Sequence, residues 1–173
     1  ADRLKGSGVK YLTIDCGWFK SDGGNWMVAQ GDWEPNPRLF PYGLEGTAQA
    51  IRERGLTPGL WFEMEVVGMQ SPNFDNPTFV EHMLKRDGIP VTASGRRFLD
   101  FRDPWVEEYV TDKVIRRLRD CGFEYVKLDY NETIGIGVDG AESLGEGLRL
   151  FFVCVVSLFV QLRVVVGVVL FVY

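Results

Sequence analysis

Side chains able to act as nucleophiles or proton carriers gather in one short segment, which reads FEYVKLDYN at 123–131. Because side chains alternate between the two faces of a strand, Lys127, Asp129 and Asn131 share one face of this segment. Burying an ammonium group two residues from a carboxylate is costly unless the two pair with each other or with a ligand. A carboxylate that a neighbouring cation keeps ionised is a suitable nucleophile for sugar chemistry, and a purely structural Lys–Asp pair is the alternative.

Carboxylates also stand at the ends of other segments with strand character, and they favour a site over a structural pair. These carboxylates are Asp15, Glu63 and Asp100. The C-terminal ends of parallel strands are where α/β enzymes place their chemistry. Tryptophans offer apolar faces on which a pyranose ring could lie, and these are Trp18, Trp33 and Trp61. A glycine-rich run at 135–140 predicts either a flexible lid over a pocket or a weak phosphate-binding signal.

The elements that must position these side chains alternate between strands and helices along the first 150 residues. Apolar runs predict four strands, at 9–15, 57–65, 98–101 and 123–131. Helical spacing with caps and terminal glycines predicts three helices, at 43–54, 76–86 and 103–122. This order implies a parallel sheet with right-handed crossovers, either half of an eight-fold barrel or the core of an open doubly wound sheet. The first strand–helix turn has no GxGxxG sequence, which disfavours a dinucleotide-binding sheet.

Composition narrows the classes of partner and cofactor. The chain has 173 residues, enough for one domain with a real core, and a net charge of −5 that gives no reason to expect nucleic acid. Its cysteines are too few and too scattered for a disulfide framework or a zinc site, and they are Cys16, Cys121 and Cys154. A single histidine, His82, excludes a multi-histidine metal site, and we expect it to be a surface or packing residue. We therefore predict neither a metal nor a cofactor.

A break in composition follows residue 150. Residues 151–173 are apolar and rich in valine, and Arg163 is their single charged side chain. Three interpretations apply: a coding sequence read out of frame, a strand or helix of the core, or a membrane span. The charge near the middle and the valine enrichment disfavour the membrane span, and we favour the first interpretation.

Four segments together resemble the catalytic barrel of α-galactosidases of glycoside hydrolase family 36. They read IDCGW at 14–18, GDWEPNPRLFPYGL at 31–44, GLWFEMEVVG at 59–68 and YVKLDYNETIGIGVDGAESLGEGLR at 125–149. The resemblance implies an α/β fold in which residues 1–150 are a partial catalytic domain, the incomplete N-terminal half of a (β/α)8 TIM barrel. The apolar tail at 151–173 is then expected to lie outside the family fold.

The resemblance also implies roles for residues at the strand ends. Asp129 resembles the catalytic nucleophile, and Lys127 and Asn131 resemble the sugar-hydroxyl ligands beside it. Trp61 resembles the aromatic wall of the galactose subsite.

Further substrate-binding positions come from the other motifs. Asp15 resembles the carboxylate that grips the sugar hydroxyls, and Cys16 stands where the family usually has a second acidic residue, a departure that bears on galactose preference. An arginine near the third predicted strand is Arg96 or Arg97, and we favour Arg96.

The expected function is retaining hydrolysis of terminal α-D-galactosyl residues in raffinose- or melibiose-type oligosaccharides. The family's acid/base residue lies on a later strand that nothing in this chain matches, so we expect the chain to carry the nucleophile half of the site and to be inactive alone. The alternatives are an α-N-acetylgalactosaminidase, a raffinose-type α-galactosyl transferase, an inactive carbohydrate-binding fragment, or a membrane-tethered protein. We expect no nucleic-acid partner, disfavour a membrane, allow an oligomer for the full-length relative, and favour the cytoplasm because no signal peptide is visible.

Overall fold

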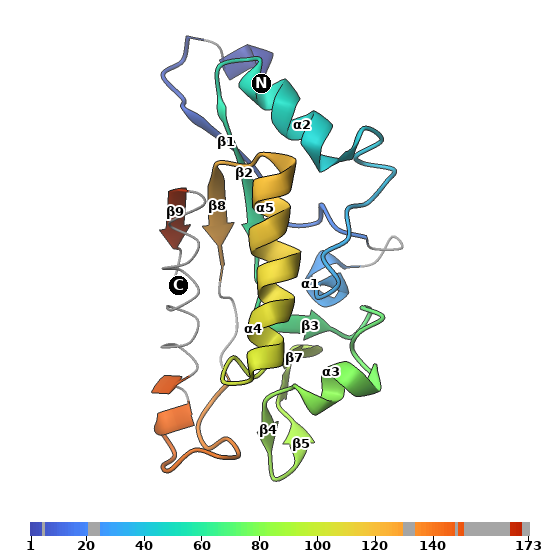
Figure 1. The fold of residues 1–173 in the computed structure, drawn as a ribbon, viewed down its shortest axis with the longest axis vertical. Coiled ribbons are helices and arrows are strands. Elements are labelled where there is room, and N and C mark those ends of the chain that lie inside the picture. Colours follow the sequence, from blue (N-terminus) through green and yellow to red (C-terminus); the bar gives the residue numbers. More distant parts are fainter. Residues whose placement is uncertain (5, 21–24, 130–133, 148, 151–166, 171–173) are drawn as a thin grey trace.

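The computed structural model describes residues 1–4, 6–20, 25–129, 134–147, 149–150 and 167–170. Its main sheet has four parallel strands in the order β1 (Tyr11–Ile14), β2 (Thr57–Phe62), β8 (Tyr125–Leu128) and β9 (Gly167–Leu170). The prediction of an α/β fold with a parallel sheet is confirmed. Within the described ranges the sheet does not close into a barrel (Figure 1).

The strand register brings one face of three strands together. Thr13 lies beside Gly59, Gly59 beside Tyr125, and Trp61 beside Lys127. A Cβ atom on Gly59 would stand 2.6 Å from Cδ1 of Tyr125 and 2.7 Å from Oγ1 of Thr13, so the glycine leaves room for both neighbours. Thr13, Gly59 and Tyr125 therefore form a row of neighbours across the three strands, two residues before Asp15, Trp61 and Lys127.

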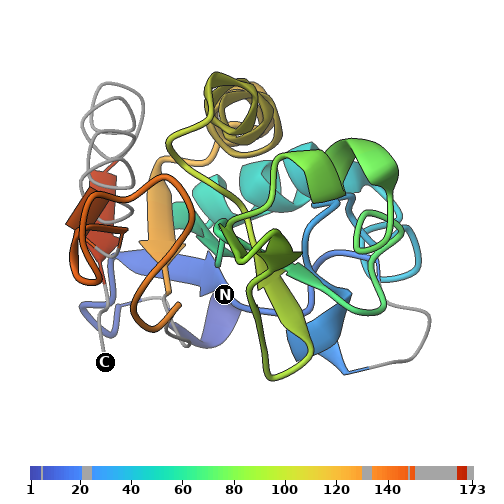
Figure 2. The ribbon, with the colours of Figure 1, turned by 90° about the horizontal axis from the view of Figure 1, so that it is seen from below.

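Helices cover one face of the sheet (Figures 1 and 2). Helix α2 (Gly43–Arg52) packs on β2, and a continuous helix comprises α4 (Pro104–Val110), a π-helical segment η2 (Thr111–Arg116) and α5 (Arg117–Cys121). The Asp103 carboxylate caps this helix by accepting from the Trp105 amide, and Gly122 ends it in a left-handed conformation. The predicted helices at 43–54 and 103–122 are confirmed.

The predicted helix at 76–86 is too long. Asn76 caps α3 (Pro77–Glu81), but the chain then enters a hairpin of β4 (Lys85–Arg86) and β5 (Ile89–Pro90). Asp87 and Gly88 both have positive φ, +53° and +75°, and form the tight turn of that hairpin. The helical pattern fails here because a two-residue turn and strand pairing take over the backbone.

The predicted strand at 98–101 is also wrong in position and partner. The structure has β7 (Arg96–Phe98), which pairs antiparallel with β3 (Val66–Gly68) and with β6 (Thr92–Ala93) in a separate sheet. The turn between β6 and β7 again uses positive φ, at Ser94 and Gly95. The connection from β2 to β8 thus contains a small antiparallel sheet in place of the parallel strand predicted at 98–101.

The remaining short elements are η1 (Asp2–Leu4) and α1 (Trp26–Ala29). In the apolar tail, β9 covers the edge of β8. The assignment of residues 151–173 to a region outside the family fold stays a prediction. No helix in the described part of the chain is both long enough and apolar enough to cross a membrane.

An aromatic cluster fills the core beside β2. Trp18 stacks on Trp33 with ring centroids 6.0 Å apart, and Phe62 lies edge-on to Trp18 at 5.2 Å. Trp18 is 1% exposed and Trp33 is 0% exposed. The prediction that these two tryptophans offer faces to a sugar is therefore wrong, because both rings are consumed by core packing.

Candidate active site

Three charged side chains meet at the C-terminal edge of the parallel sheet. Nζ of Lys127 lies 3.0 Å from Oδ2 of Asp15 and 3.9 Å from Oδ2 of Asp129. Lys127 is on β8, Asp15 directly follows β1, and Asp129 directly follows β8. The ammonium group therefore bridges carboxylates that come from two different strands, as the alternation of side chains predicts.

Trp61, on strand β2 between β1 and β8, contacts this group of charged side chains. Its indole Nε1 donates to Oδ2 of Asp129 at 3.0 Å, and the Asp129 amide donates to the carbonyl of Phe62 at 2.9 Å. The Trp61 ring is buried, 1% exposed, and lies edge-on to Trp26 at 5.6 Å. Trp61 thus holds the carboxylate of Asp129 in a fixed orientation, with its ring enclosed by other aromatic side chains.

Cys16 lies at the rim of the same charged group. Its amide donates to Oδ1 of Asp15 at 2.9 Å. Burial is the main cause that raises the pKa of the Cys16 thiol, and the Asp15 carboxylate adds to it, while Lys127 acts in the opposite direction. The group at Cys16 is therefore a neutral thiol where the resemblance leads us to expect an acid.

Arg96 is buried with Glu63 behind the strand end. Nη1 of Arg96 donates to Oε1 of Glu63 at 3.0 Å, and Nε2 of Gln30 donates to Oε2 of the same carboxylate at 3.0 Å. Arg96 is 2% exposed and Glu63 is 0% exposed. This ion pair connects β7, the end of β2 and the residue after α1.

Glu65 is a second buried carboxyl in this region. Burial is the main cause that raises its pKa well above the ordinary range, and the neighbouring Glu63 raises it further. Its Oε1 atom has no hydrogen-bond partner among the described residues. Glu65 thus differs from Glu63, whose carboxylate is held by the Arg96 guanidinium.

The structure brings together most, but not all, of the residues that the sequence singles out. Asp15, Cys16, Trp61, Lys127 and Asp129 meet at one edge. Asn131 lies outside the described residues.

Other candidates lie apart from this edge. Asp100 forms a two-point ion pair with Arg102, at 2.6 and 2.8 Å, so its expected place among the strand-end carboxylates is wrong. Gln30 was not predicted, because its contact with Glu63 joins residues far apart in sequence. The glycine-rich segment is anchored, with Arg86 donating to the carbonyls of Ile134 and Gly137 at 2.9 and 2.6 Å.

Comparison with known proteins adds a family match. The Melibiase family model matches residues 1–163, a range that continues past Arg149 into the apolar tail. Two curated relatives are the α-galactosidases Mel36A of Lactobacillus acidophilus, 28% identical over 135 residues, and AgaA of Geobacillus stearothermophilus, 32% identical over 130 residues. These matches cover 77% and 72% of this chain but 18% and 17% of the relatives, so the chain spans less than a fifth of their length.

Solved structures share the fold. A structure of GH36 α-galactosidase AgaA from G. stearothermophilus in complex with raffinose superposes with a TM-score of 0.80 at 22% identity, over 98% of this chain and 24% of that one. The α-galactosidase TtGalA from Thermus thermophilus, in complex with stachyose, gives a TM-score of 0.74 at 29% identity, over 98% and 34%. The arrangement of strands around Asp129 and Lys127 therefore recurs in larger proteins of known structure.

Proposed function

This chain belongs to the Melibiase family, and we propose on that premise that it carries the nucleophile side of a retaining α-galactosidase site. The observation that carries the proposal is the placement of Asp129, whose carboxylate accepts from Trp61 and faces Lys127 at the end of β8. The indole N–H holds this carboxylate by a hydrogen bond, and the ammonium group attracts it by charge. Asp129 is thereby suited to attack carbon, and it is the residue that the resemblance assigns to that role.

The proposed reaction has two steps. A carboxylate oxygen of Asp129 forms a bond to the anomeric carbon while the glycosidic bond breaks, and the leaving oxygen takes a proton from a second carboxyl group. Water then attacks the same carbon, gives its proton to that second group, and releases Asp129. In retaining glycosidases the two carboxyl groups stand about 5–5.5 Å apart. We propose that the second group lies outside residues 1–173, because the resemblance assigns it to a later strand.

The proposed substrate class is a terminal α-galactosyl group on a raffinose-type oligosaccharide. Family relatives whose structures hold raffinose or stachyose support this choice. Asp15, fixed by Lys127 and by the Cys16 amide, is a ready acceptor for sugar hydroxyl groups. Cys16 itself offers a neutral thiol in place of a second acid, so we propose weaker discrimination at the hydroxyls that this position contacts.

The strand order and the family resemblance also support a proposal for the fold. We propose that residues 1–150 form the N-terminal half of a (β/α)8 barrel, to which the tail adds β9 beside β8. The parallel order β1, β2, β8 and the likeness to solved α-galactosidases support the barrel half. In barrels of this kind the chemistry sits at the C-terminal ends of the strands, which is where Asp15 and Asp129 lie.

The test detects the nucleophile with a substrate that does not require the acid/base group. The substrate 5-fluoro-α-D-galactosyl fluoride releases fluoride without needing a proton donor, so a chain with only the nucleophile forms a stable galactosyl ester. We expect mass spectrometry of the 173-residue chain to find this ester on Asp129, and Asp129→Asn to abolish it. An aryl α-galactoside should show no turnover with the same chain.

Each other outcome overturns a defined part of the proposal. Clear hydrolysis of the aryl α-galactoside that Asp129→Asn abolishes would contradict the external acid. An ester on another residue, or equal labelling of Asp129→Asn, would contradict the nucleophile. The corresponding α-D-glucosyl and α-N-acetylgalactosaminyl fluorides serve as controls, and faster labelling by either would contradict the galactoside class.

A further inference from the structure

The end of strand β2 makes contact with the proposed nucleophile through two consecutive residues. Trp61 donates its indole N–H to the Asp129 carboxylate, and Phe62 accepts the Asp129 amide at its carbonyl. The next residue in the chain is Glu63. Contacts that restrain Glu63 therefore also restrain Trp61 and Phe62, the two residues that orient Asp129.

Glu63 is fixed by charge. Its two carboxylate oxygens accept from Nη1 of Arg96 and Nε2 of Gln30, both at 3.0 Å. The carboxylate and the guanidinium are almost fully buried, at 0% and 2% exposure, so water does not weaken their attraction. Gln30 itself is tied to the backbone, since its Nε2 also donates to the carbonyl of Met27.

The partners of Glu63 come from elements that are themselves held in place. Arg96 opens β7, which pairs with β3 through Gly68 and with β6 through Ala93. Gln30 accepts the Gly68 amide at its backbone carbonyl, at 2.9 Å. The carboxylate of Glu63 is therefore clamped between two parts of the chain that already contact each other.

We propose that Glu63 is a positioning residue for the nucleophile: its buried ion pair with Arg96, supported by Gln30, holds residues 61–63 so that Trp61 and Phe62 keep Asp129 aligned for attack. In this proposal Arg96 acts through Glu63 and needs no contact with the sugar. The inference rests on the proposed role of Asp129. It adds Glu63, two residues after Trp61, as a residue that affects the reaction without touching the reacting atoms.

Glu65 supplies a matched control within the same segment. It is also a buried glutamate, 4% exposed, and it stands two residues after Glu63. Burial and the nearby Glu63 raise its pKa well above the ordinary range, and its Oε1 atom has no hydrogen-bond partner among the described residues. A Glu→Gln change removes one partner of a buried ion pair at position 63, whereas Glu65 has no ion pair among the described residues.

The experiment measures how fast 5-fluoro-α-D-galactosyl fluoride labels Asp129 in the 173-residue chain. We expect Glu63→Gln to slow the labelling rate at saturating reagent about 10- to 100-fold, because small displacements of a reacting group have effects of that size. The reagent concentration for half-maximal rate should change by less than about threefold, since Glu63 does not touch the sugar. Glu65→Gln should label at the wild-type rate.

A second variant separates positioning from folding. Glu63→Gln could unfold the chain by burying the Arg96 guanidinium without its carboxylate. The double variant Glu63→Leu with Arg96→Met removes both charges, and such replacements often preserve stability. We expect this variant to melt near the wild-type temperature yet label as slowly as Glu63→Gln.

The outcomes distinguish this proposal from the one it rests on. If the wild-type chain forms no ester at Asp129, the proposed function fails. If the wild-type chain is labelled and the folded double variant is labelled equally fast, the positioning role of Glu63 fails by itself. Equal slowing by Glu65→Gln would also overturn it, because the effect would then follow from changing any buried glutamate in this segment and not from losing the ion pair with Arg96.

Discussion

The indole Nε1 of Trp61 and the Oδ2 atom of Asp129 lie 3.0 Å apart, so a residue on β2 holds the carboxylate that follows β8. We predict that Trp61→Phe, which keeps a ring but removes the donor, slows formation of the galactosyl ester on Asp129 about tenfold or more. A hydrogen bond to a charged group contributes about 1.5–3 kcal/mol, which corresponds to that range. Ester formation with the activated fluoride, followed by mass spectrometry, measures the effect.

Trp33→Phe is the matched control for this change. Trp33 is equally buried, at 0% exposure, but its Nε1 has no hydrogen-bond partner among the described residues, so the change removes no hydrogen bond to Trp61 or to the nucleophile. We expect it to lower the melting temperature while leaving the labelling rate of the folded chain within about twofold of wild type. Equal slowing by both variants would mean that ring packing, and not the bond to Asp129, sets the rate.

Cys16 provides a chemical probe of the charges around Lys127. Burial first, and then the Asp15 carboxylate, raise the pKa of its thiol, so less thiolate is present at any given pH and alkylation is slow. We predict that Asp15→Asn speeds iodoacetamide labelling of Cys16 at pH 8, because it removes a charge that raises this pKa. Peptide mass spectrometry measures the rate.

Cys121 is the internal control for the alkylation experiment. Burial, with the adjacent Glu45, raises its pKa to about 12, and it should stay unlabelled in both chains. A galactose-like imino sugar should slow alkylation of Cys16 if this thiol lines the sugar site as we propose. Unchanged alkylation of Cys16 in Asp15→Asn would contradict the charge arrangement described above.

The central strands and the charged edge could be predicted because their signals are local. Alternation along a strand places Lys127 and Asp129 on one face, and the same rule with parallel order places Asp15 beside them. The region between β2 and β8 could not be assigned by periodicity. There the amide of Leu84 donates to the carbonyl of Phe98, and that of Val91 to Leu84, so tertiary pairing overrides a helical pattern.

A signal for that region was nevertheless present in the turns. Asp87–Gly88 is the dipeptide that favours a two-residue hairpin turn, and it falls at the end of the segment with helical spacing. The ion pair of Glu63 with Arg96 had no such signal. It joins the residue that follows β2 to the first residue of β7, and only the folded chain shows that both are buried together.

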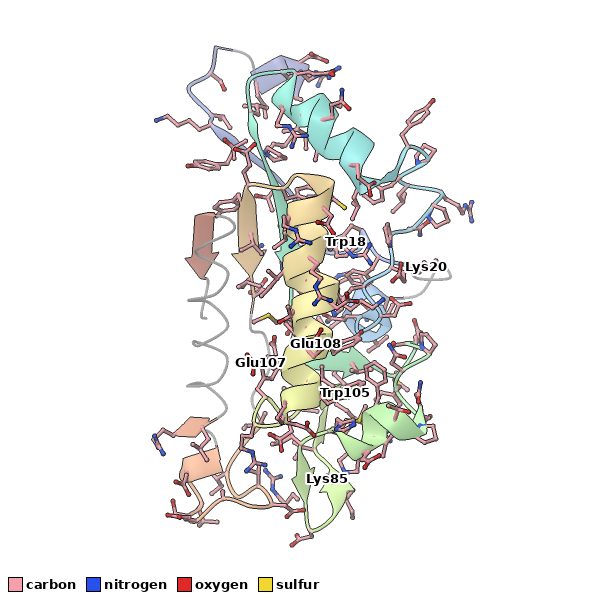
Figure 3. All side chains as sticks on the ribbon, in the orientation of Figure 1. Trp18, Lys20, Lys85, Trp105, Glu107 and Glu108 are labelled. Atoms are coloured by element: carbon pink, nitrogen blue, oxygen red, sulfur yellow. The ribbon has the colours of Figure 1, made fainter. Side chains whose placement is uncertain are left out.

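The stability of the N-terminus of helix α4 depends on pH through the carboxylate of Asp103. Oδ1 accepts from the Trp105 amide at 2.9 Å, and Oδ2 lies 2.6 Å from Nδ1 of His82, whose ring stacks on that of Trp105 with centroids 4.3 Å apart. Trp105 lies beside α3 (Figure 3). Burial acts to raise the pKa of Asp103, but these contacts outweigh it and hold the pKa below its ordinary value. Because the pKa of Asp103 is lower in the folded chain than in the unfolded chain, its carboxylate stabilises the fold fully at pH values above the unfolded-state pKa. This stabilisation is lost as the pH falls through the folded-state pKa.

We therefore predict that Asp103→Ala lowers the free energy of unfolding by about 1 kcal/mol at pH 7 and by less below about pH 4. Urea unfolding at several pH values measures the difference. Asn76→Ala is the matched control, since Asn76 caps α3 with a neutral side chain that accepts from the Thr78 amide at 3.0 Å. Its cost should not vary with pH, and an equal decline for both variants would refute the ionic origin.

Asp139 anchors the segment after β8 to the β4–β5 hairpin, which carries Lys85 at the lower end of the molecule (Figure 3). Its Oδ1 accepts from the Asp87 amide at 2.9 Å and its Oδ2 from the Gly88 amide at 2.8 Å, while its own amide donates to the carbonyl of Lys85. We predict that Asp139→Ala speeds hydrogen exchange at the Asp87 and Gly88 amides at least tenfold, because both lose a charged acceptor.

The same change should also expose the segment at 134–140 to proteases. Arg86 still donates to the carbonyls of Ile134 and Gly137, so we expect faster cleavage within the segment without global unfolding. Asp120→Ala is the control, since its carboxylate pairs with Arg119 on the exposed end of α5. It should leave exchange at the hairpin unchanged. Faster exchange across the whole sheet in Asp139→Ala would show that the contact stabilises the entire fold and is not a local anchor.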